Sequence, residues 1–253
     1  MLRTRVIPCL QLIDQAIVKT VKFGRYTYIG DPVNTVRIFN ELEVDELCFL
    51  DIRATIEKRK PNLKILTEIA NECFMPLSYG GGIRDVETAL KILSIGFEKI
   101  VINTAAVENP YLITKITRQS GNQSVIVSID VKISFNGSYS VYSNDGSVKT
   151  KLNAIEWAKK AEDAGAGELL ITSIDRDGTW KGYDLEIIHK ITDAVSIPVI
   201  ANGGAGSISD MRKVVKESGA SAVALGSMIV YQQKNMGVLI NFPDRSELQK
   251  ILT

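Results

Sequence analysis

The chain has 253 residues, of which 45% are hydrophobic and 23% are charged, and its net charge is +1. This balance is ordinary for a globular protein and gives no reason to expect a nucleic-acid partner. No apolar run approaches the ~20 residues needed to cross a membrane. The N-terminus lacks the pattern of a signal peptide, so we expect a cytoplasmic protein without membrane contact.

Strand-like and helix-like segments alternate from one end of the chain to the other. The strand candidates are near-continuous apolar runs, as expected for parallel strands that are covered on both faces. They lie at residues 5–11, 46–51, 75–79, 99–103, 124–130, 168–173, 197–202 and 221–225. Helical patterns follow them, and the capping residues predicted for six helices are Asp31, Asp85, Asn109, Asn153, Asp184 and Ser209. Eight such units without a linker predict one α/β domain, residues 1–253, folded as a closed (β/α)8 TIM barrel.

The two halves of the chain repeat each other. Shifting the sequence by 122 residues superimposes Glu46 on Glu168, and shifting it by 119 superimposes Gln11 on Asp130. This repeat predicts two half-barrels of four units each, so functional positions are expected in pairs across a twofold axis.

Two long connections interrupt the alternation. One, at 12–30, is basic and aromatic, and the other, at 132–151, contains an Asn-Gly and an Asp-Gly pair. These pairs indicate tight turns and predict a hairpin in the second connection. Long loops in a compact domain are usually functional.

The cysteines and the histidine limit the chemistry. Cys9, Cys48 and Cys73 lie in or beside apolar runs, which is typical of buried free thiols in a reducing compartment. His189 is the only histidine and falls within a helical pattern. This argues against a histidine-based triad and against a common type of zinc site, so we expect neither a metal nor another cofactor.

Glycines and polar side chains end four of the predicted strands. Absent side chains let backbone amides approach an anion, so these ends are candidate phosphate sites. The predicted ligand-binding residues there are Gly82, Asn103, Thr104, Gly204, Gly226 and Ser227. Because the repeat places two such sites on opposite sides, a small molecule phosphorylated at both ends would fit. Lys19 could clamp a phosphate as a point charge. The alternative is that the glycines only form tight turns and that Lys19 is solvated.

Acidic residues near the strand ends are candidate catalysts. Asp130 follows an apolar strand, where desolvation would raise its pKa, and is the best candidate base. Asp177 is the next candidate, although the neighbouring Asp175-Arg176 pair could simply stabilise its loop. Gln11 occupies the position equivalent to Asp130, and a carboxamide can neither donate nor take a proton near neutral pH. The pattern is therefore a paired-acid site with one acid missing.

Four charged residues stand at the starts of predicted strands and should lie together at the opposite mouth of the barrel. They are Arg5, Glu46, Lys99 and Glu168. The functional interpretation is a salt-bridged gate at the bottom of the barrel, and the alternative is a set of solvated charges.

Over residues 1 to about 227, the chain resembles a known family, the cyclase subunit of imidazole glycerol phosphate synthase. The matching stretches include Gly30-Asp-Pro32, Phe49-Leu-Asp-Ile52, Gly80-Gly-Gly-Ile-Arg84, Ile102-Asn-Thr-Ala-Ala-Val107, Thr172-Ser-Ile-Asp-Arg-Asp-Gly-Thr179 and Gly203-Gly-Ala-Gly206. The resemblance implies a (β/α)8 barrel that docks a glutaminase at its N-terminal face. It also implies that ammonia passes through the barrel to a ribulosyl ligand bearing two phosphates.

The resemblance assigns roles to the residues already singled out. It implies that Asp130 is one catalytic acid/base, and that the family's other catalytic aspartate falls on Gln11. The implied ligand-binding residues are Lys19, Gly82, Asn103, Thr104, Gly204, Gly226 and Ser227. The implied ammonia gate is formed by Arg5, Glu46, Lys99 and Glu168.

Three departures point to a particular branch of the family. They are Gln11 itself, Asp14-Gln15 where an Asp-Gly turn is usual, and a tail, 228–253, unlike the usual last loop and helix. These features are more similar to a paralogous branch associated with acetamidino modification of surface-polysaccharide sugars. In that branch a glutaminase, a barrel protein and a sugar amidotransferase are thought to work together.

The leading hypothesis is therefore a barrel that conducts ammonia from a glutaminase and has lost most cyclase activity. Removing a general acid or base typically costs ~10²–10⁴-fold in rate. One alternative is an authentic histidine-pathway cyclase in which Asp130 or Asp177 compensates for Gln11. A second alternative is a non-catalytic scaffold whose phosphate sites bind a regulatory metabolite.

Overall fold

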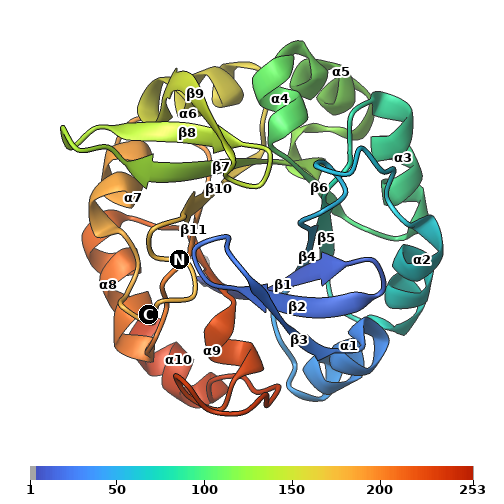
Figure 1. Ribbon diagram of the computed structural model, residues 1–253, viewed down its shortest axis with the longest axis vertical. Helices are drawn as coiled ribbons and strands as arrows, with labels where there is room; N and C mark the ends of the chain where they lie inside the picture. The colour runs from blue at the N-terminus through green and yellow to red at the C-terminus, as the bar shows by residue number, and fades with distance from the viewer. Residues whose placement is uncertain (1–3, 253) are drawn as a thin grey trace.

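The computed structural model describes residues 4–252 and shows a ring of strands enclosed by helices (Figure 1). All eight predicted strands are present: β1 (Arg5–Ile13), β4 (Leu47–Asp51), β5 (Leu77–Gly80), β6 (Lys99–Ile102), β7 (Val125–Ile133), β10 (Glu168–Ser173), β11 (Val199–Asn202) and β12 (Ala222–Leu225). They pair in the order β10-β11-β12-β1-β4-β5-β6-β7, and β10 also pairs with β7. This last pairing closes the sheet, so the predicted (β/α)8 barrel is confirmed.

The barrel is surrounded by α1 (Pro32–Glu41), α2 (Leu63–Glu72), α3 (Val86–Ile95), α5 (Tyr111–Ser120), α6 (Ala154–Asp163), α7 (Leu185–Thr192) and α8 (Ile208–Ser218). Two short helices, α4 (Thr104–Glu108) and α9 (Ser227–Val230), directly follow β6 and β12, and η1 (Asn122–Ser124) precedes β7. Within residues 4–252, no helix has the length and apolar character needed to cross a membrane.

Four of the six predicted helix caps are confirmed. The side chains of Asp31, Asp85, Asn153 and Asp184 each accept a hydrogen bond from a backbone N–H in the first helical turn. Two predictions are wrong. Pro110 stands at the start of α5 and Asn109 contributes only its backbone carbonyl. Ser209 lies inside α8, because Ser207 is the capping residue.

Two β-hairpins extend the barrel at the C-terminal ends of β1 and β7. The first consists of β2 (Ala16–Thr20) and β3 (Tyr26–Gly30), neither of which was predicted. The second consists of β8 (Tyr139–Ser143) and β9 (Val148–Asn153) and confirms the predicted hairpin. Both barrel strands run on to pair antiparallel with these hairpins, which is why β1 and β7 are longer than expected.

The hairpins make the internal repeat visible in the backbone. Gln11 pairs with Val18 where β1 leaves the barrel, and Asp130 pairs with Tyr142 where β7 does the same. The two positions superimposed by the repeat therefore occupy equivalent places. The sequence suggested that each of these residues ends its strand. In the structure, β1 continues to Ile13 and β7 to Ile133.

The hydrophobic core has two parts. The larger part fills the space between the strands and the helices. The smaller part lies inside the barrel, because its residues alternate along the strands with those facing the helices; it consists of Ile7, Cys9, Cys48, Val101, Ile126, Leu170, Ile200, Ala222 and Ala224. Cys9 and Cys48 are buried free thiols, as predicted, whereas the free thiol of Cys73 is only half-buried.

The tail, which the sequence marked as unlike the family's usual last loop and helix, forms a loop and a final helix. A β-bridge between Tyr231 and Val238 closes the loop after α9, and α10 (Arg245–Leu252) packs against α8. Leu248 is buried and Arg245 forms an ion pair with Glu43 at 2.7 Å. The tail therefore completes the outer layer between α8 and α1.

Candidate functional site

A cavity lies at the C-terminal ends of the barrel strands. Eight of the predicted catalytic and ligand-binding residues line it: Gln11, Lys19, Gly82, Asn103, Thr104, Asp130, Asp177 and Gly226. Gly204 and Ser227 follow β11 and β12 but do not line this cavity. The fold thus brings together most of the residues selected from the sequence, drawn from both halves of the repeat.

Gln11 is held by the first hairpin. Its Oε1 accepts a hydrogen bond from the backbone N of Thr20 at 2.8 Å, and its Nε2 donates to Thr20 Oγ1 at 3.0 Å. The carboxamide therefore uses a donor and an acceptor, whereas an ionised carboxylate would offer acceptors alone. Gln11 fixes the end of β2 at a position where the sequence led us to expect an acid.

Lys19 and Asp177 form a buried ion pair beside Gln11. Lys19 Nζ donates to Asp177 Oδ1 at 2.9 Å and to the carbonyl oxygen of Thr20 at 2.7 Å, and the Lys19 side chain is only 4% exposed. The alternative that Lys19 is solvated is wrong. Asp177, the second acid candidate, is committed to a cation in this arrangement.

Asp130 is the acid best suited to proton transfer. Burial raises the pKa of Asp130 to about 7, and the nearby Asp145 carboxylate adds to this effect. Asn103 Nδ2 donates to Asp130 Oδ2 at 2.6 Å, and Ser128 Oγ donates to Oδ1 at 3.4 Å. A carboxyl group with a pKa near 7 can both give and take a proton at neutral pH. The raised pKa predicted from the apolar strand is confirmed.

Asp145 is a cavity residue that sequence reasoning missed. It lies in the turn between β8 and β9, where Asn144, Asp145 and Gly146 have φ angles of 53°, 54° and 70°. Burial raises the pKa of Asp145 to about 7, although the Arg53 guanidinium opposes the shift. The Asp-Gly pair indicated only a turn, and nothing in the spacing showed that this turn reaches the cavity.

One of the two predicted phosphate sites is engaged by the chain's own groups. Thr104 Oγ1 accepts a hydrogen bond from the backbone N of Asn144 at 3.0 Å. The side-chain amide of Asn103 is bonded to the acid on β7, and the backbone N of Gly82 donates to Thr55 Oγ1 at 3.4 Å. The tip of the second hairpin therefore covers this side of the cavity.

The paired glycines are needed for close packing. Gly82 has a φ of +70°, and a Cβ atom there would lie 2.8 Å from the carbonyl oxygen of Arg59. Gly204 has a φ of +108°, and a Cβ atom there would collide with the carbonyl oxygen of Gly182. The close packing at both positions therefore supports the alternative that these glycines form tight turns, whether or not phosphate binds.

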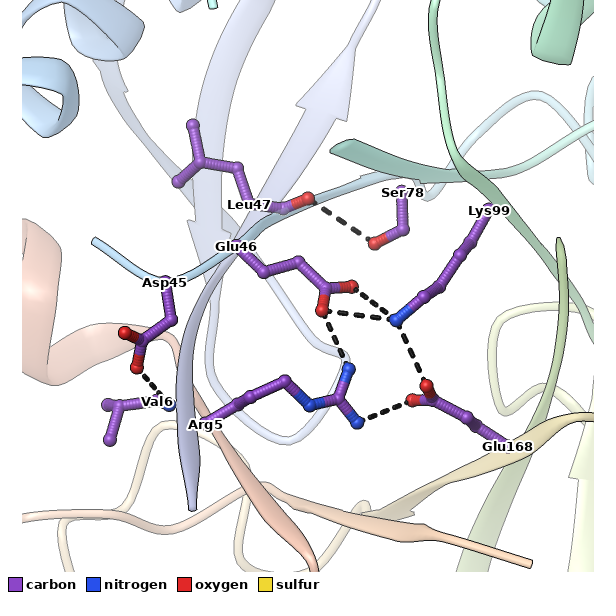
Figure 2. Close-up of polar contacts among 8 residues, drawn as sticks. All are labelled: Arg5, Val6, Asp45, Glu46, Leu47, Ser78, Lys99 and Glu168. Atoms are coloured by element: carbon purple, nitrogen blue, oxygen red, sulfur yellow. Dashed lines mark hydrogen bonds and ion pairs between the residues drawn. The ribbon is translucent and has the colours of Figure 1, made fainter. Parts of the chain in front are cut away.

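The four charged residues at the strand starts form one closed ring, shown in Figure 2 and called the four-charge ring below. Arg5 bridges Glu46 at 2.7 Å and Glu168 at 2.8 Å. Lys99 bridges the same two acids at 3.2 Å and 2.9 Å. Each cation therefore contacts both anions across the interior of the barrel.

The four-charge ring is largely removed from solvent. The Glu46 side chain is 3% exposed, Glu168 12%, Lys99 14% and Arg5 28%. The alternative that these residues are solvated strand-start charges is wrong. The ring lies at one end of the barrel interior and the cavity at the other, with the small interior core between them.

These features define a (β/α)8 barrel with a cavity at one mouth and a four-charge ring at the other. A profile of the family described as "Histidine biosynthesis protein" matches residues 5–235. The chain belongs to this family, as a relative of the HisF subunits of imidazole glycerol phosphate synthase.

Individual relatives match almost the whole chain. The chain is 50% identical over 248 residues to the "Putative imidazole glycerol phosphate synthase subunit hisF2" of Pseudomonas aeruginosa, covering 98% of this chain and 99% of that protein. It is 44% identical over 253 residues to the "Putative imidazole glycerol phosphate synthase subunit hisF3" of Vibrio vulnificus, covering 100% and 97%. It is 45% identical over 233 residues to the "Imidazole glycerol phosphate synthase subunit HisF" of Alkaliphilus metalliredigens, covering 92% of each protein.

Proposed function

We propose that this chain is the barrel subunit of a glutamine amidotransferase complex and that it conducts ammonia from a glutaminase toward amidation of a surface-polysaccharide sugar. The glutaminase would dock at the N-terminal face, around the four-charge ring. A separate sugar amidotransferase would use the ammonia that leaves the barrel, which is the arrangement implied by the resemblance.

The observation that carries this proposal is the four-charge ring itself. Each of its acids is shared by Arg5 and Lys99, and the ring spans the interior at the strand starts. Beyond it lies an apolar layer that includes Ala222 and Ala224 together with larger side chains such as Leu170. Such a layer opposes the passage of ions, which are costly to desolvate, much more than that of a small neutral molecule such as ammonia.

The choice of acceptor has separate support. Gln11 presents a carboxamide, bonded on both sides to Thr20, where a cyclase of this family would present an acid. The names of two relatives carry the numbers 2 and 3, which fits an additional copy with a task outside histidine synthesis. These points favour an acceptor other than the ribulosyl substrate.

Deleting the gene in its own organism tests the proposal. We expect growth without added histidine and loss of an amidated sugar from the surface polysaccharide, measured by mass spectrometry of the purified polymer. A histidine requirement would instead favour the cyclase. An unchanged polysaccharide without a histidine requirement would leave the non-catalytic scaffold as the better interpretation.

Complementation with ring variants tests the route of ammonia. Lys99→Met should fail to restore amidation at ordinary ammonium concentrations and should restore it when ammonium is supplied in excess. Rescue by ammonium distinguishes a blocked route from a misfolded barrel. Lys91→Met, at an exposed ion pair on α3, is the matched control and should complement fully. Full complementation by Lys99→Met without added ammonium would show that the four-charge ring takes no part in ammonia transfer.

A second function, authentic cyclase activity, is favoured by Asp130, whose pKa of about 7 suits acid/base chemistry. Turnover of the bisphosphorylated ribulosyl substrate with free ammonia separates the two functions. If the missing acid silences the cyclase, Gln11→Asp should raise turnover at least ~10-fold. If the variant does not exceed the wild-type turnover, cyclase activity becomes the leading interpretation.

A further inference from the structure

A second cavity lies at the same mouth of the barrel, where the first hairpin approaches the turn of the second. Its volume is about 450 Å³, and Phe23 and Asp145 line both cavities. Arg25 and Tyr26, from the first hairpin, line only the second cavity, and so does Arg53, from the loop after β4. The second cavity therefore adjoins the first and brings two arginines to this mouth.

The two arginines of the second cavity have donors to offer. Arg25 is exposed and Arg53 is half-buried. Among residues 4–252, neither guanidinium forms an ion pair or donates a hydrogen bond, although Arg53 lies near enough to Asp145 to oppose the raised pKa of that carboxyl. A guanidinium carries five N–H donors in a planar fork that matches a carboxylate. The second cavity is therefore suited to an anionic group that comes from outside the chain.

The surface around the second cavity is basic. The whole chain is nearly balanced, with 30 basic and 29 acidic residues. Apart from the buried Lys19, the connections 12–30 and 132–151 carry five basic residues against two acidic ones: Lys22, Arg25, Lys132, Lys149 and Lys151 against Asp14 and Asp145. A protein that binds over these hairpins would be complementary if its own surface were acidic.

The first hairpin also has an open edge. Within the described sheet, β3 pairs with β2 and with no other strand. Tyr26 and Tyr28 are exposed on the same face of β3, because side chains alternate along a strand, and Val21 is exposed in the connection from β2. An open edge can accept a strand from another protein, and Tyr and Arg are enriched in protein–protein interfaces. These features favour a protein segment over a small anion as the occupant.

We infer that the first hairpin is the docking surface for the enzyme that consumes the ammonia. An acidic, extended segment of that enzyme pairs with the open edge of β3 and places a carboxylate between Arg25 and Arg53. The inference rests on the proposed function, because delivery of ammonia is what requires a partner at this mouth. Ammonia that leaves an uncovered mouth is diluted and protonated by water, whereas a partner seated on the hairpin would receive it directly.

Photo-crosslinking in the protein's own organism tests where the partner docks. Benzoylphenylalanine in place of Tyr28 should crosslink, on irradiation, to a protein that mass spectrometry identifies. Deleting the gene of that protein should remove the amidated sugar from the polysaccharide without causing a histidine requirement. Benzoylphenylalanine in place of Lys159, an exposed residue of α6, is the control and should not give this product.

Charge reversal tests the second cavity. Arg25→Glu leaves the lining of the first cavity unchanged. In complementation it should lower the amidated sugar at least ~10-fold at ordinary ammonium concentrations, because like charges that face each other across an interface oppose docking. The variant should still co-purify with the glutaminase, which shows that the barrel is folded. Lys159→Glu makes the same charge change on the outer wall and should complement fully.

Several outcomes would overturn the inference. One is full complementation by Arg25→Glu, and another is a Tyr28 position that crosslinks only to the glutaminase, to a second copy of the barrel, or to nothing. If Arg25→Glu fails to complement while Tyr28 gives no crosslink to the ammonia-consuming enzyme, the second cavity takes a small anion instead. A failure of the proposed function is a different result, because deletion of the barrel gene would then leave the sugar amidated.

Discussion

At the scale of single residues, the cavity departs from a paired-acid site in two ways. Gln11 exchanges hydrogen bonds with Thr20 and contributes no titrating group. Asp145 adds a carboxyl group from the second hairpin, and its charge helps to raise the pKa of Asp130. The site therefore still holds two carboxyl groups that titrate near pH 7, at positions that the internal repeat does not relate.

The raised pKa of Asp130 makes folding depend on pH. A carboxyl whose pKa is higher in the folded state than in the unfolded chain favours folding while it is protonated, and this advantage is lost as pH rises from about 4 to 7. Asp130→Asn should therefore gain stability relative to wild type between pH 5 and pH 8, by on the order of 2 kcal/mol. Urea unfolding at both pH values measures this. The exposed Asp163→Asn is the control variant, and a parallel pH dependence of Asp130→Asn and wild type would contradict the assignment.

Residue chemistry also separates what the sequence could predict from what it could not. The apolar run before Asp130 was sufficient to predict its burial and raised pKa. Asp145 could not be found in this way, because its position depends on how a polar turn folds back over the strand ends. For the same reason, the sequence could not show that Asn144 would contact Thr104.

At the scale of elements, the two hairpins meet over the cavity. Phe23, from the connection between β2 and β3, lines the cavity and lies beside Gly146 in the β8–β9 turn. Lys22 N also donates to the carbonyl oxygen of Asp177 at 3.0 Å. The hairpins thus form the roof of the site, and their mutual contact is part of its structure.

A glycine comparison tests this contact. A Cβ atom at Gly146 would lie 2.9 Å from Phe23 Cδ2 and 3.1 Å from Ile174 Cδ1, at a φ of +70°. Gly137 has a similar φ of +79° and nothing within 4 Å of an added Cβ atom. Gly137→Ala should therefore cost only the backbone strain of about 1 kcal/mol, and Gly146→Ala should cost about 1–3 kcal/mol more. Thermal unfolding measures both, and equal losses would show that the hairpins do not press on each other.

The strands illustrate the limits of pattern reading. The eight barrel strands are apolar because both of their faces are covered, and all eight could be predicted. The strand β3 was missed because it is partly exposed: Tyr26 and Tyr28 are 53% and 63% exposed, and no apolar run marks it. The strand β2 is buried, but its apolar run, Ala16–Val18, is too short to indicate a strand. The helix caps at Asn109 and Ser209 failed by one or two positions, which local patterns do not resolve.

At the scale of the whole molecule, the four-charge ring is a stability element as well as a candidate gate. Ion pairs at an exposed rim are typically worth ~0–1 kcal/mol each. The burial of the four-charge ring changes this expectation, because removing one partner of a buried pair leaves an uncompensated charge.

Glu46→Gln tests the ring directly. Glu46 contacts both Arg5 and Lys99, and its side chain is 3% exposed, so the substitution should cost about 3–5 kcal/mol. Glu87→Gln breaks an exposed pair with Lys91 and should cost no more than about 0.5 kcal/mol. Chemical denaturation of the two variants gives the comparison. A loss below about 1 kcal/mol for Glu46→Gln would mean that water screens the ring.

The reactivity of the two thiols inside the barrel can show whether the barrel opens in solution. Cys9 and Cys48 are neighbours on β1 and β4, and the pKa of Cys9 is raised well above its usual value by hydrogen bonding to Cys48 and by burial. Only the thiolate attacks a disulfide reagent, so the raised pKa of Cys9 and the burial of both side chains should make the pair slow to react. When Ellman's reagent is added, Cys73 should react first. Cys9 and Cys48 should then react together, at the rate at which the barrel unfolds. Cys9 also lines the cavity, so it is fast reaction of Cys48 in native buffer that would show that the barrel opens without unfolding.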